Sequence, residues 1–167
     1  SLHREENTKD KKSINNIINI LNEINNKFQK DIIFPCHPRI RTILKNKNKN
    51  KKIRIIKPLG FTDYVNLQIN SFVVLSDSGT ISEESSILNF SALNLRDTHE
   101  RHESMEEGGV MMVGMDKKRI LNGIKMISGD KLNSKNKIVK DYKVLNVSDK
   151  ITKIVASYIP YVNKNIW

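Results

Sequence analysis

The sequence predicts an α/β fold in which a Rossmann-like parallel sheet carries helices on both faces. Short apolar runs alternate with segments of helical periodicity along the 167 residues, which is the spacing of strand–helix–strand units. Polar and glycine-containing segments follow several of the apolar runs, and open sheets of this kind bind ligands beyond the carboxyl ends of their strands. A chain of this length suffices for one domain with its own core.

The first half of the chain predicts two buried strands and three helices. Apolar residues recur at helical spacing from Ile14 to Phe28, and Asn7, Thr8 or Asp10 can cap this helix. The expected elements are a helix over 14–28, a strand over 31–36, a short helix over 40–45, a strand over 53–57 and a helix capped by Thr62 or Asp63 that ends near residue 70.

The second half repeats the alternation. Apolar runs predict strands at 72–75, 91–95 and 110–113, and helical patterns predict helices at 80–88, 117–127 and 148–158. Residues 96–109 form a polar segment in which we expect no regular element. Chemistry is therefore expected in the turns after Leu2, Cys36, Leu75 and Leu95.

The composition favours a soluble, cytoplasmic protein. No apolar run reaches the roughly eighteen residues that a membrane helix needs, and the first residues lack the apolar core of a signal peptide. Cys36 follows an apolar run and is expected to be a buried filler. The four histidines lack metal-site spacing, so no metal or other cofactor is expected: they are His3, His37, His99 and His102.

The net charge of +11 leaves a basic nucleic-acid-binding module open as an alternative. Residues 45–52 alternate Lys and Asn but contain no aromatic residue on which a base could stack. We therefore favour a solvated basic surface over a nucleic-acid partner.

The strongest site candidate is the stretch from Ser76 to Glu84, between a strand and a helix. Gly79 allows a sharp turn and close approach of a ligand, while free N–H groups at the helix start favour an anion. Ser78 and Thr80 add hydroxyl groups, and Glu84 can accept hydrogen bonds from the vicinal hydroxyls of a ribose. The pattern suggests a nucleotide, although an ordinary capped strand–helix turn explains it equally well.

Two further charged segments are candidates. His3 can transfer protons near neutral pH, and Arg4 can hold a phosphate or carboxylate in a fork. Arg96 and Arg101 follow the end of an expected strand and can complete a diphosphate cage. The alternative for the segment with His3 and Arg4 is a charged N-terminal tail, and the alternative for the segment with Arg96 and Arg101 is a solvated loop.

Five motifs in this order resemble those of the non-hydrolysing UDP-N-acetylglucosamine 2-epimerases. They read H-R-E-E-N at 3–7, P-C-H-P-R-I-R at 35–41, P-L-G-F-T-D-Y at 58–64, S-D-S-G-T-I-S-E-E at 76–84 and R-D-T-H-E-R-H-E at 96–103. The resemblance implies that residues 1–167 are the C-terminal, UDP-binding domain of a GT-B-type fold with two Rossmann-like domains. The absence of an initiator Met and the early first motif fit a chain cut from something longer.

The resemblance also implies roles for individual residues. His3 would lie beside the reacting sugar and UDP, with Arg4 and Asn7 nearby. Ser78, Gly79 and Thr80 would contact the diphosphate, Glu84 would hold the ribose, and Arg96 and Arg101 would bind phosphate. Leu59 and Phe61 would lie near the uracil.

The reaction implied is inversion at C2 of a UDP-N-acetylhexosamine by elimination and re-addition of UDP, without NAD or a metal. The acidic residues that move protons belong to the family's N-terminal domain, so this domain alone is expected to be inactive. We expect the protein's own N-terminal domain as a partner and a homodimer as the full-length state.

Departures from the family pattern leave the substrate open. Thr80 stands where many members have a second glycine, and His102 replaces a proline. The form S-D-S-G-T-I-S-E-E-S-S is similar to the branch that makes UDP-N-acetyl-L-fucosamine. A UDP-dependent GT-B glycosyltransferase and a catalytically silent nucleotide-sensing domain remain alternatives, and the tail over 158–167 is expected to pack across a neighbouring domain.

Overall fold

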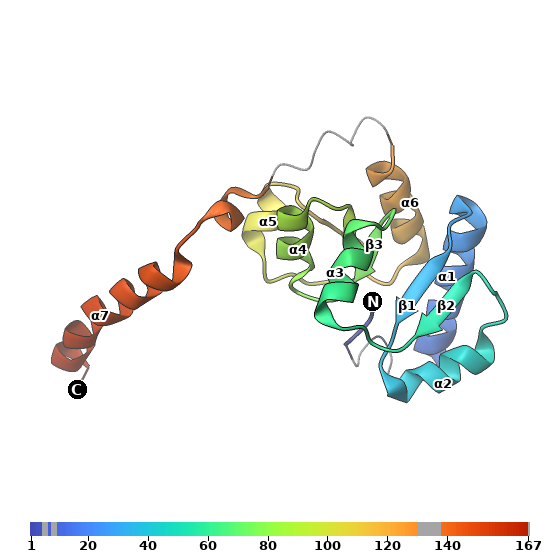
Figure 1. Cartoon of the computed structure of the whole chain (residues 1–167), viewed down its shortest axis with the longest axis horizontal. Helices are drawn as coiled ribbons and strands as arrows, with labels where there is room; N and C mark the ends of the chain where they lie inside the picture. Colours follow the sequence, from blue (N-terminus) through green and yellow to red (C-terminus); the bar gives the residue numbers. More distant parts are fainter. Residues whose placement is uncertain (5–6, 8–9, 130–137, 167) are drawn as a thin grey trace.

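Helices and strands alternate along the chain in the computed structural model, which describes residues 1–4, 7, 10–129 and 138–166 (Figure 1). The described elements are α1 (Lys11–Phe28), β1 (Ile32–Pro35), α2 (Pro38–Lys47), β2 (Ile53–Ile56), α3 (Phe61–Ile69), β3 (Val74–Ser76), α4 (Ile81–Leu88), β4 (Ala92–Asn94), α5 (His102–Glu106), β5 (Met111–Met112), α6 (Lys117–Ile127), the 3₁₀ turn η2 (Lys140–Lys143) and α7 (Val147–Asn165). The predicted order of strands and helices is confirmed except for α5, which was not predicted.

All described strand pairs are parallel, as predicted. β1 pairs with β2, while β3, β4 and β5 form a second sheet in that order. The first two residues lie between these sheets, because Leu2 forms a parallel bridge with Cys36 and the amino group of Ser1 donates to the Leu75 carbonyl at 2.6 Å. The resulting order is β2, β1, residues 1–2, β3, β4, β5, which is that of a Rossmann-like sheet.

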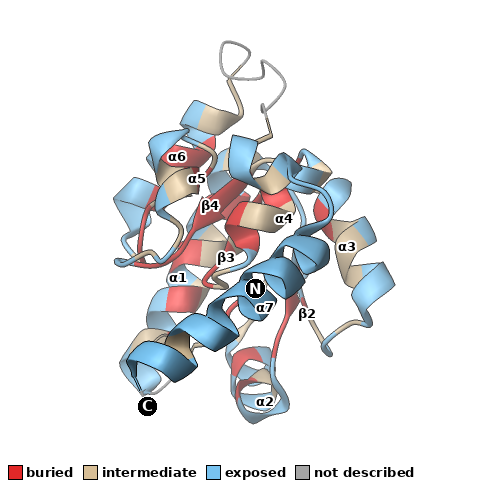
Figure 2. Ribbon diagram, turned by 90° about the vertical axis from the view of Figure 1, so that its left-hand side faces the viewer, coloured by how far each residue is buried: buried red, intermediate tan, exposed pale blue. Residues whose placement is uncertain are grey.

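Helices cover both faces of this sheet. On one face, Ile17 of α1 and Ile120 of α6 are packed into the same core cluster as Leu93 of β4. On the other face, Ile81 of α4 packs with Val74 and Ala92. Figure 2 shows the buried residues concentrated in the strands and on the inner sides of these helices. Alternate strand residues therefore face opposite layers, as a sheet covered on both sides requires.

Helix ends follow local capping chemistry. Asp10 caps α1 by accepting from the Ser13 N–H at 2.7 Å, which confirms one of the three predicted caps. The prediction of Thr62 or Asp63 as the cap of α3 is wrong, because α3 begins at Phe61 and the Gly60 carbonyl accepts from the Tyr64 N–H. Thr8, another predicted cap, lies outside the described residues.

Two helices differ from the sequence prediction. α5 forms within the segment 96–109, where no regular element was predicted. The prediction missed this helix because five residues are too few to show a helical period. α7 continues to Asn165, well past the expected end at residue 158, and contains Pro160. Cys36 is 1% exposed, so the prediction of a buried filler is confirmed.

α7 projects away from the body of the protein (Figures 1 and 2). None of its residues is buried, although its apolar side chains recur at helical spacing, as at Ile151, Val155, Tyr158 and Ile159. Among the described residues, nothing covers this apolar stripe, which is the kind of helix face that normally packs against a partner. Within the described residues, no helix is both long and apolar enough to cross a membrane.

Candidate functional site

A buried carboxylate joins the N-terminal motif to the Ser-Gly turn. Asp77 follows β3 and is fully buried. One of its oxygens accepts from the His3 N–H at 2.9 Å, and the other accepts from the Arg4 N–H at 3.1 Å and the Asn7 side-chain amide at 2.9 Å. The three donors satisfy the buried charge and hold His3, Arg4 and Asn7 beside the turn that follows β3.

Sequence reasoning missed this organising role of Asp77. It treated the residue as part of a turn or as a helix cap, whereas the side chain contacts residues that lie 70 to 74 positions away along the chain. The available signal was an ionisable residue directly after a buried strand. Lone pairs of a buried carboxylate must be satisfied, so such a residue implies donors from elsewhere in the fold.

The turn from Ser78 to Thr80 leads directly into α4. The Ser78 N–H donates to the Ser76 hydroxyl at 3.1 Å, and the Ser78 and Thr80 hydroxyls are 2.9 Å apart. Thr80 is the N-cap of α4 but makes no side-chain bond to the helix N–H groups. These N–H groups and the hydroxyls form a donor-rich rim that favours an anion.

Gly79 provides close approach and not an unusual backbone angle. Positive φ angles among the described glycines occur at Gly108 and Gly114, so the turn itself does not require glycine at position 79. A Cβ atom there would lie 3.7 Å from Nη1 of Arg96 and 4.0 Å from Nη2 of Arg101. Gly79 thus lies in the predicted turn without a left-handed backbone angle, and both guanidinium groups lie next to the position that a Cβ would take.

Glu84 is held from two sides. Its Oε1 accepts from the Thr80 hydroxyl and its Oε2 from the Gln68 side-chain amide, both at 2.6 Å. Gln68 belongs to α3 and is 3% exposed, so its position is fixed by packing. The carboxylate is consequently oriented before any ligand arrives, yet each oxygen retains capacity for a further hydrogen bond.

Three arginines surround one carboxylate at the edge of the site. Nη2 of Arg96 donates to Oε1 of Glu100 at 2.8 Å, Nη2 of Arg4 lies 3.7 Å from the same oxygen, and Nη1 of Arg101 lies 3.9 Å from Oε2. The Arg96 hydrogen bond and charge, with smaller contributions from Arg4 and Arg101, lower the pKa of Glu100. Arg101 also donates to Glu83.

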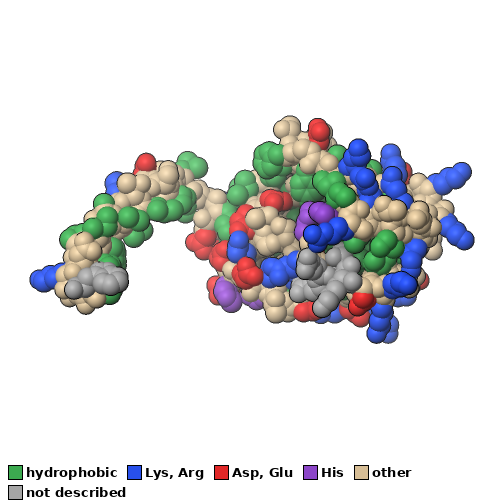
Figure 3. Space-filling model, turned by 90° about the horizontal axis from the view of Figure 1, so that it is seen from below, with side chains coloured by type: hydrophobic (Ala, Val, Ile, Leu, Met, Phe, Trp, Pro, Cys, Tyr) green, Lys and Arg blue, Asp and Glu red, His purple; other side chains and the backbone are tan. Residues whose placement is uncertain are grey.

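This arginine cluster has an excess of positive charge and an unused donor. The Arg96 side chain is 4% exposed, and its buried Nε has no hydrogen-bond partner in the described structure. Figure 3 shows acidic and basic side chains close together on the face of the body nearest α7. A buried guanidinium beside glycine backbone and helix N–H groups is suited to binding a phosphate.

The structure thus brings together most of the predicted site residues. Contacts in the structure connect the Ser78–Thr80 turn, directly or through Asp77, Glu83 and Glu100, with Arg4, Asn7, Glu84, Arg96 and Arg101. The backbone of His3 is fixed by Asp77, and its side chain is exposed.

Leu59 and Phe61 are placed apart from this network. Phe61 opens α3 with its side chain 85% exposed, and Leu59 lies two residues earlier. Gln68 of the same helix contacts Glu84. Nothing else in the described contacts tests the predicted place of these two residues near a uracil.

No group of three metal-ligating side chains gathers within the part of the chain that the structure describes. The rings of His99 and His102 do stack edge to face, with centroids 4.8 Å apart, but without further ligands.

Comparison with known proteins gives a consistent result. The family model described as UDP-N-acetylglucosamine 2-epimerase matches residues 1–156. A UDP-N-acetylglucosamine 2-epimerase of Methanocaldococcus jannaschii is 37% identical over 142 residues, which are 81% of this chain and 39% of that protein.

Two solved structures share the fold. A UDP-N-acetylglucosamine 2-epimerase from Rickettsia bellii superposes with a TM-score of 0.83 at 38% identity, over 100% of this chain and 45% of that one. The M. jannaschii UDP-GlcNAc 2-epimerase, in complex with UDP-GlcNAc and UDP, gives a TM-score of 0.75 at 34% identity, over 93% of this chain and 44% of that one.

The chain spans less than half the length of these relatives. The match nevertheless covers almost the whole of the chain and includes every motif that surrounds Asp77 and the arginine cluster. The chain therefore belongs to the UDP-N-acetylglucosamine 2-epimerase family.

Proposed function

We propose that residues 1–167 are the C-terminal, UDP-binding domain of a non-hydrolysing UDP-N-acetylhexosamine 2-epimerase. The observation that carries this proposal is the buried Asp77, which holds His3 and Arg4 against the Ser78–Thr80 turn. The Ser-Gly turn and the arginines then offer donors for a diphosphate, and Glu84 offers oriented acceptors for a ribose at the start of the same helix.

The proposed binding mode assigns one group of residues to each part of the UDP-sugar. Ser78, Gly79 and Thr80 would donate to the diphosphate through backbone and hydroxyl groups, with Arg96 and Arg101 neutralising its charge. Glu84 would accept from the ribose hydroxyls. Arg4 and Asn7 would border the sugar phosphate, while Leu59 and Phe61 would flank the uracil.

The proposed reaction is an elimination followed by an addition. A base removes the proton at C2 of the sugar while the C1–oxygen bond to UDP breaks, and UDP leaves with the bonding electrons. Re-addition of UDP at C1 and protonation of C2 on the opposite face give the epimer, so no redox cofactor is consumed. His3, at the edge of the nucleotide site, is the residue of this domain that we place beside the reacting sugar.

The first experiment measures nucleotide binding by this chain. Isothermal titration calorimetry with UDP, pyrophosphate, AMP and a short DNA duplex should show selective binding of UDP. Arg96→Met should weaken both UDP and pyrophosphate about tenfold or more, since a hydrogen-bonded charge at a buried site is worth about 1.5–3 kcal/mol. Salt-sensitive DNA binding that survives Arg96→Met would instead support the nucleic-acid alternative.

A matched control for Arg96→Met is Arg54→Met. Arg54 lies on β2 with its side chain 60% exposed and pairs with Asp31, so the substitution removes the same charge away from the site. UDP affinity should be unchanged in this variant. Equal losses in both variants would show that net charge, and not the site, determines binding.

The proposed partner of this domain is the protein's own N-terminal domain, and α7 supports this proposal. Its apolar stripe lies outside the body of the domain, where it can pack against a second domain. In the full-length protein, Ile151→Asp on the stripe should lower the thermal midpoint, whereas Lys153→Asp on the opposite side should not. Equal midpoints for the two variants would contradict this packing.

Activity should require both domains. The full-length protein should interconvert UDP-GlcNAc and UDP-ManNAc, or a related pair, and should incorporate deuterium from heavy water at C2, whereas the isolated domain should do neither. A well-folded full-length protein that exchanges no C2 proton in any UDP-N-acetylhexosamine would refute the activity. We further propose that the full-length enzyme is a cytoplasmic homodimer. Its molar mass, measured by light scattering during size-exclusion chromatography, tests the dimer.

A further inference from the structure

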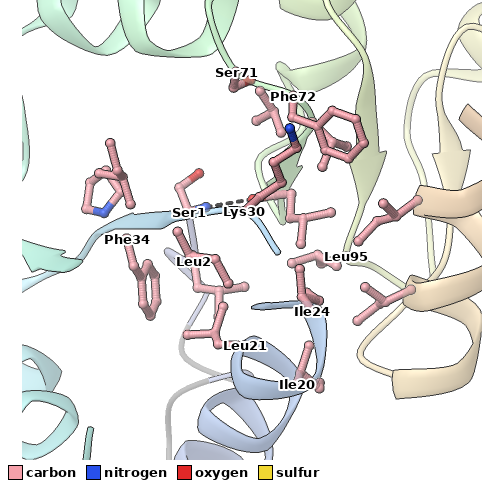
Figure 4. A pocket seen from close by; sticks show the side chains of 18 of the residues that line it. Ser1, Leu2, Ile20, Leu21, Ile24, Lys30, Phe34, Ser71, Phe72 and Leu95 are labelled. Carbon is pink, nitrogen blue, oxygen red and sulfur yellow. Dashed lines mark hydrogen bonds between the residues drawn. The ribbon is translucent and has the colours of Figure 1, made fainter. Parts of the chain in front are cut away.

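The Ser78–Thr80 turn is supported from two sides of the domain. On one side, the amino group of Ser1 is bonded to the Leu75 carbonyl beside a cavity with largely apolar walls (Figure 4). On the other side, Arg101 is the N-cap of α5, and the 3₁₀ turn η2 contacts both α5 and α4. The last of the five motifs ends at Glu103, so η2 lies outside all of them.

The backbone of η2 is anchored in the interior of the domain. Val139, which directly precedes η2, is fully buried, and its N–H donates to the Ser86 hydroxyl of α4 at 2.9 Å. The Lys140 N–H donates to Oε1 of Glu107 at 3.3 Å. The Tyr142 N–H in turn donates to the Val139 carbonyl at 3.0 Å. These bonds fix the backbone that carries the Tyr142 side chain.

The Tyr142 side chain holds a carboxylate of α5. Its hydroxyl donates to Oε1 of Glu103, in the first turn of that helix, at 2.9 Å. Desolvation, followed by the bond to Glu103, raises the pKa of Tyr142, so the hydroxyl keeps its proton and can donate at neutral pH. The backbone N–H of Glu103 and then the Tyr142 hydroxyl lower the pKa of Glu103, so this carboxyl is charged.

Arg101 has acidic neighbours on both helices and pairs with the one on α4. Its Nε donates to Oε1 of Glu83, whereas no hydrogen bond or ion pair joins it to Glu103 among the described contacts. The charge of Arg101 nevertheless contributes to the lowered pKa of Glu103, after the two hydrogen bonds, so these groups interact. With Nε on Glu83, Nη2 of Arg101 lies 4.0 Å from the position of a Cβ on Gly79, beside the turn proposed to bind the diphosphate.

We propose that Tyr142 is a positioning residue for Arg101. By holding Glu103, its hydroxyl keeps this carboxylate from drawing the guanidinium away from Glu83 and from the Ser78–Thr80 turn. Without the hydroxyl, Glu103 would have to satisfy its charge elsewhere, and Arg101 acts on it more strongly than His102 does.

The consequence is a fixed orientation of the Arg101 fork. Because Nε is occupied by Glu83, the two Nη groups remain available to the oxygens of a phosphate, which a guanidinium binds best in a fixed fork geometry. This consequence rests on the proposed UDP site, whereas the position of the Arg101 side chain can be tested without a ligand.

Calorimetric titration with pyrophosphate measures the coupling between Tyr142 and Arg101. Tyr142→Phe keeps the ring and removes the hydroxyl, and the dissociation constant should rise about fivefold, a typical coupling within one hydrogen-bonded network. Addition of Glu103→Gln removes the competing charge and should restore the original affinity. In an Arg101→Met background, Tyr142→Phe should have no further effect. Tyr161→Phe is the matched control, since Tyr161 lies on α7 and is 61% exposed, and it should leave the affinity unchanged.

Nuclear magnetic resonance of the arginine side chains tests the position of Arg101 without a ligand. The Arg101 Nε–H signal, identified by its loss in Arg101→Met, should be protected from exchange with water by the bond to Glu83. Protection should fall several-fold in Tyr142→Phe and return when Glu103→Gln is added. If the unmodified chain binds neither UDP nor pyrophosphate while this signal behaves as expected, the proposed UDP site is wrong and the positioning of Arg101 stands.

Three results would overturn the positioning role. The first is a Tyr142→Phe variant with unchanged pyrophosphate affinity and unchanged protection of the Arg101 Nε–H. The second is a loss that Glu103→Gln does not restore, because the hydroxyl would then only stabilise the fold. The third is an equal gain in affinity from Glu103→Gln with and without the Tyr142 hydroxyl, which would show an effect of net charge.

Discussion

Replacing Glu84 by Ala should separate ribose recognition from diphosphate recognition. Each carboxylate oxygen already accepts one hydrogen bond, from Thr80 or from Gln68, at 2.6 Å. A carboxylate offers about four lone-pair positions, so the pair of oxygens can still accept from two vicinal hydroxyls. Hydrogen bonds to charged groups are worth about 1.5–3 kcal/mol each. Two such bonds at the lower value amount to about 3 kcal/mol, or roughly a hundredfold in the dissociation constant.

The assay is calorimetric titration of the variant with UDP and with pyrophosphate. The dissociation constant for UDP should rise about a hundredfold, and that for pyrophosphate should change less than threefold, because the diphosphate contacts are made by other residues. Equal losses for the two ligands, or an unchanged UDP affinity, would refute a ribose role for Glu84.

A second variant, Glu84→Gln, distinguishes a loss of ribose contacts from a loss of folding stability. Glu84→Ala leaves the buried Gln68 amide without its acceptor, which costs about 1–3 kcal/mol of folding free energy. Glu84→Gln keeps the shape and one acceptor oxygen, so it should retain more of the stability while still weakening UDP selectively. Thermal midpoints measured beside the titrations show whether lost binding merely follows lost folding.

Three further predictions concern charge at the site. Asp77→Asn places an amide among three donors and should lower the free energy of unfolding by about 3 kcal/mol, measured by urea denaturation. Glu100→Gln removes the anion that now neutralises Arg96 and should tighten pyrophosphate binding several-fold in calorimetry; weaker binding would show that Glu100 orients the arginines instead. For a chain with a free amino group at Ser1, burial lowers the pKa of this group from its ordinary value of 8.0 to about 6, so the unfolded state binds more protons between these values. The free energy of unfolding should thus be complete above pH 8 and fall by roughly 3 kcal/mol or less as the pH drops to 6, an effect that acetylation of Ser1 should abolish in urea titrations.

The sheet was predictable because parallel strands covered on both faces are almost uninterrupted apolar runs. The run over 31–36 contains β1, and the run over 53–57 contains β2, each within one residue of its bounds. α5 was missed for the opposite reason. Four of its five residues are polar or charged, and it is held by local turns and by the bond from the Gly109 N–H to the Ser104 carbonyl, which no periodicity reveals.

The candidate site was predictable in its parts and not in its assembly. Polar residues after strand ends marked the Ser78–Thr80 turn and Arg96, because carboxyl ends of parallel strands meet at one edge. The contacts that unite them, from Asp77 to His3, Arg4 and Asn7, join segments that are far apart in sequence. A single sequence contains no signal for such a pairing, and the binding roles of these residues stay predictions.

The same long-range contact links the middle of the sheet to the proposed UDP site. Leu2 and Ser1 are held by Cys36 and Leu75, and the very next residue, His3, is bonded to Asp77. His3 and Arg4 are therefore positioned from two sides, by the sheet through residues 1–2 and by the buried Asp77 carboxylate. The proposed place of His3 beside a reacting sugar requires a position held within a fraction of an ångström, which this double anchoring favours.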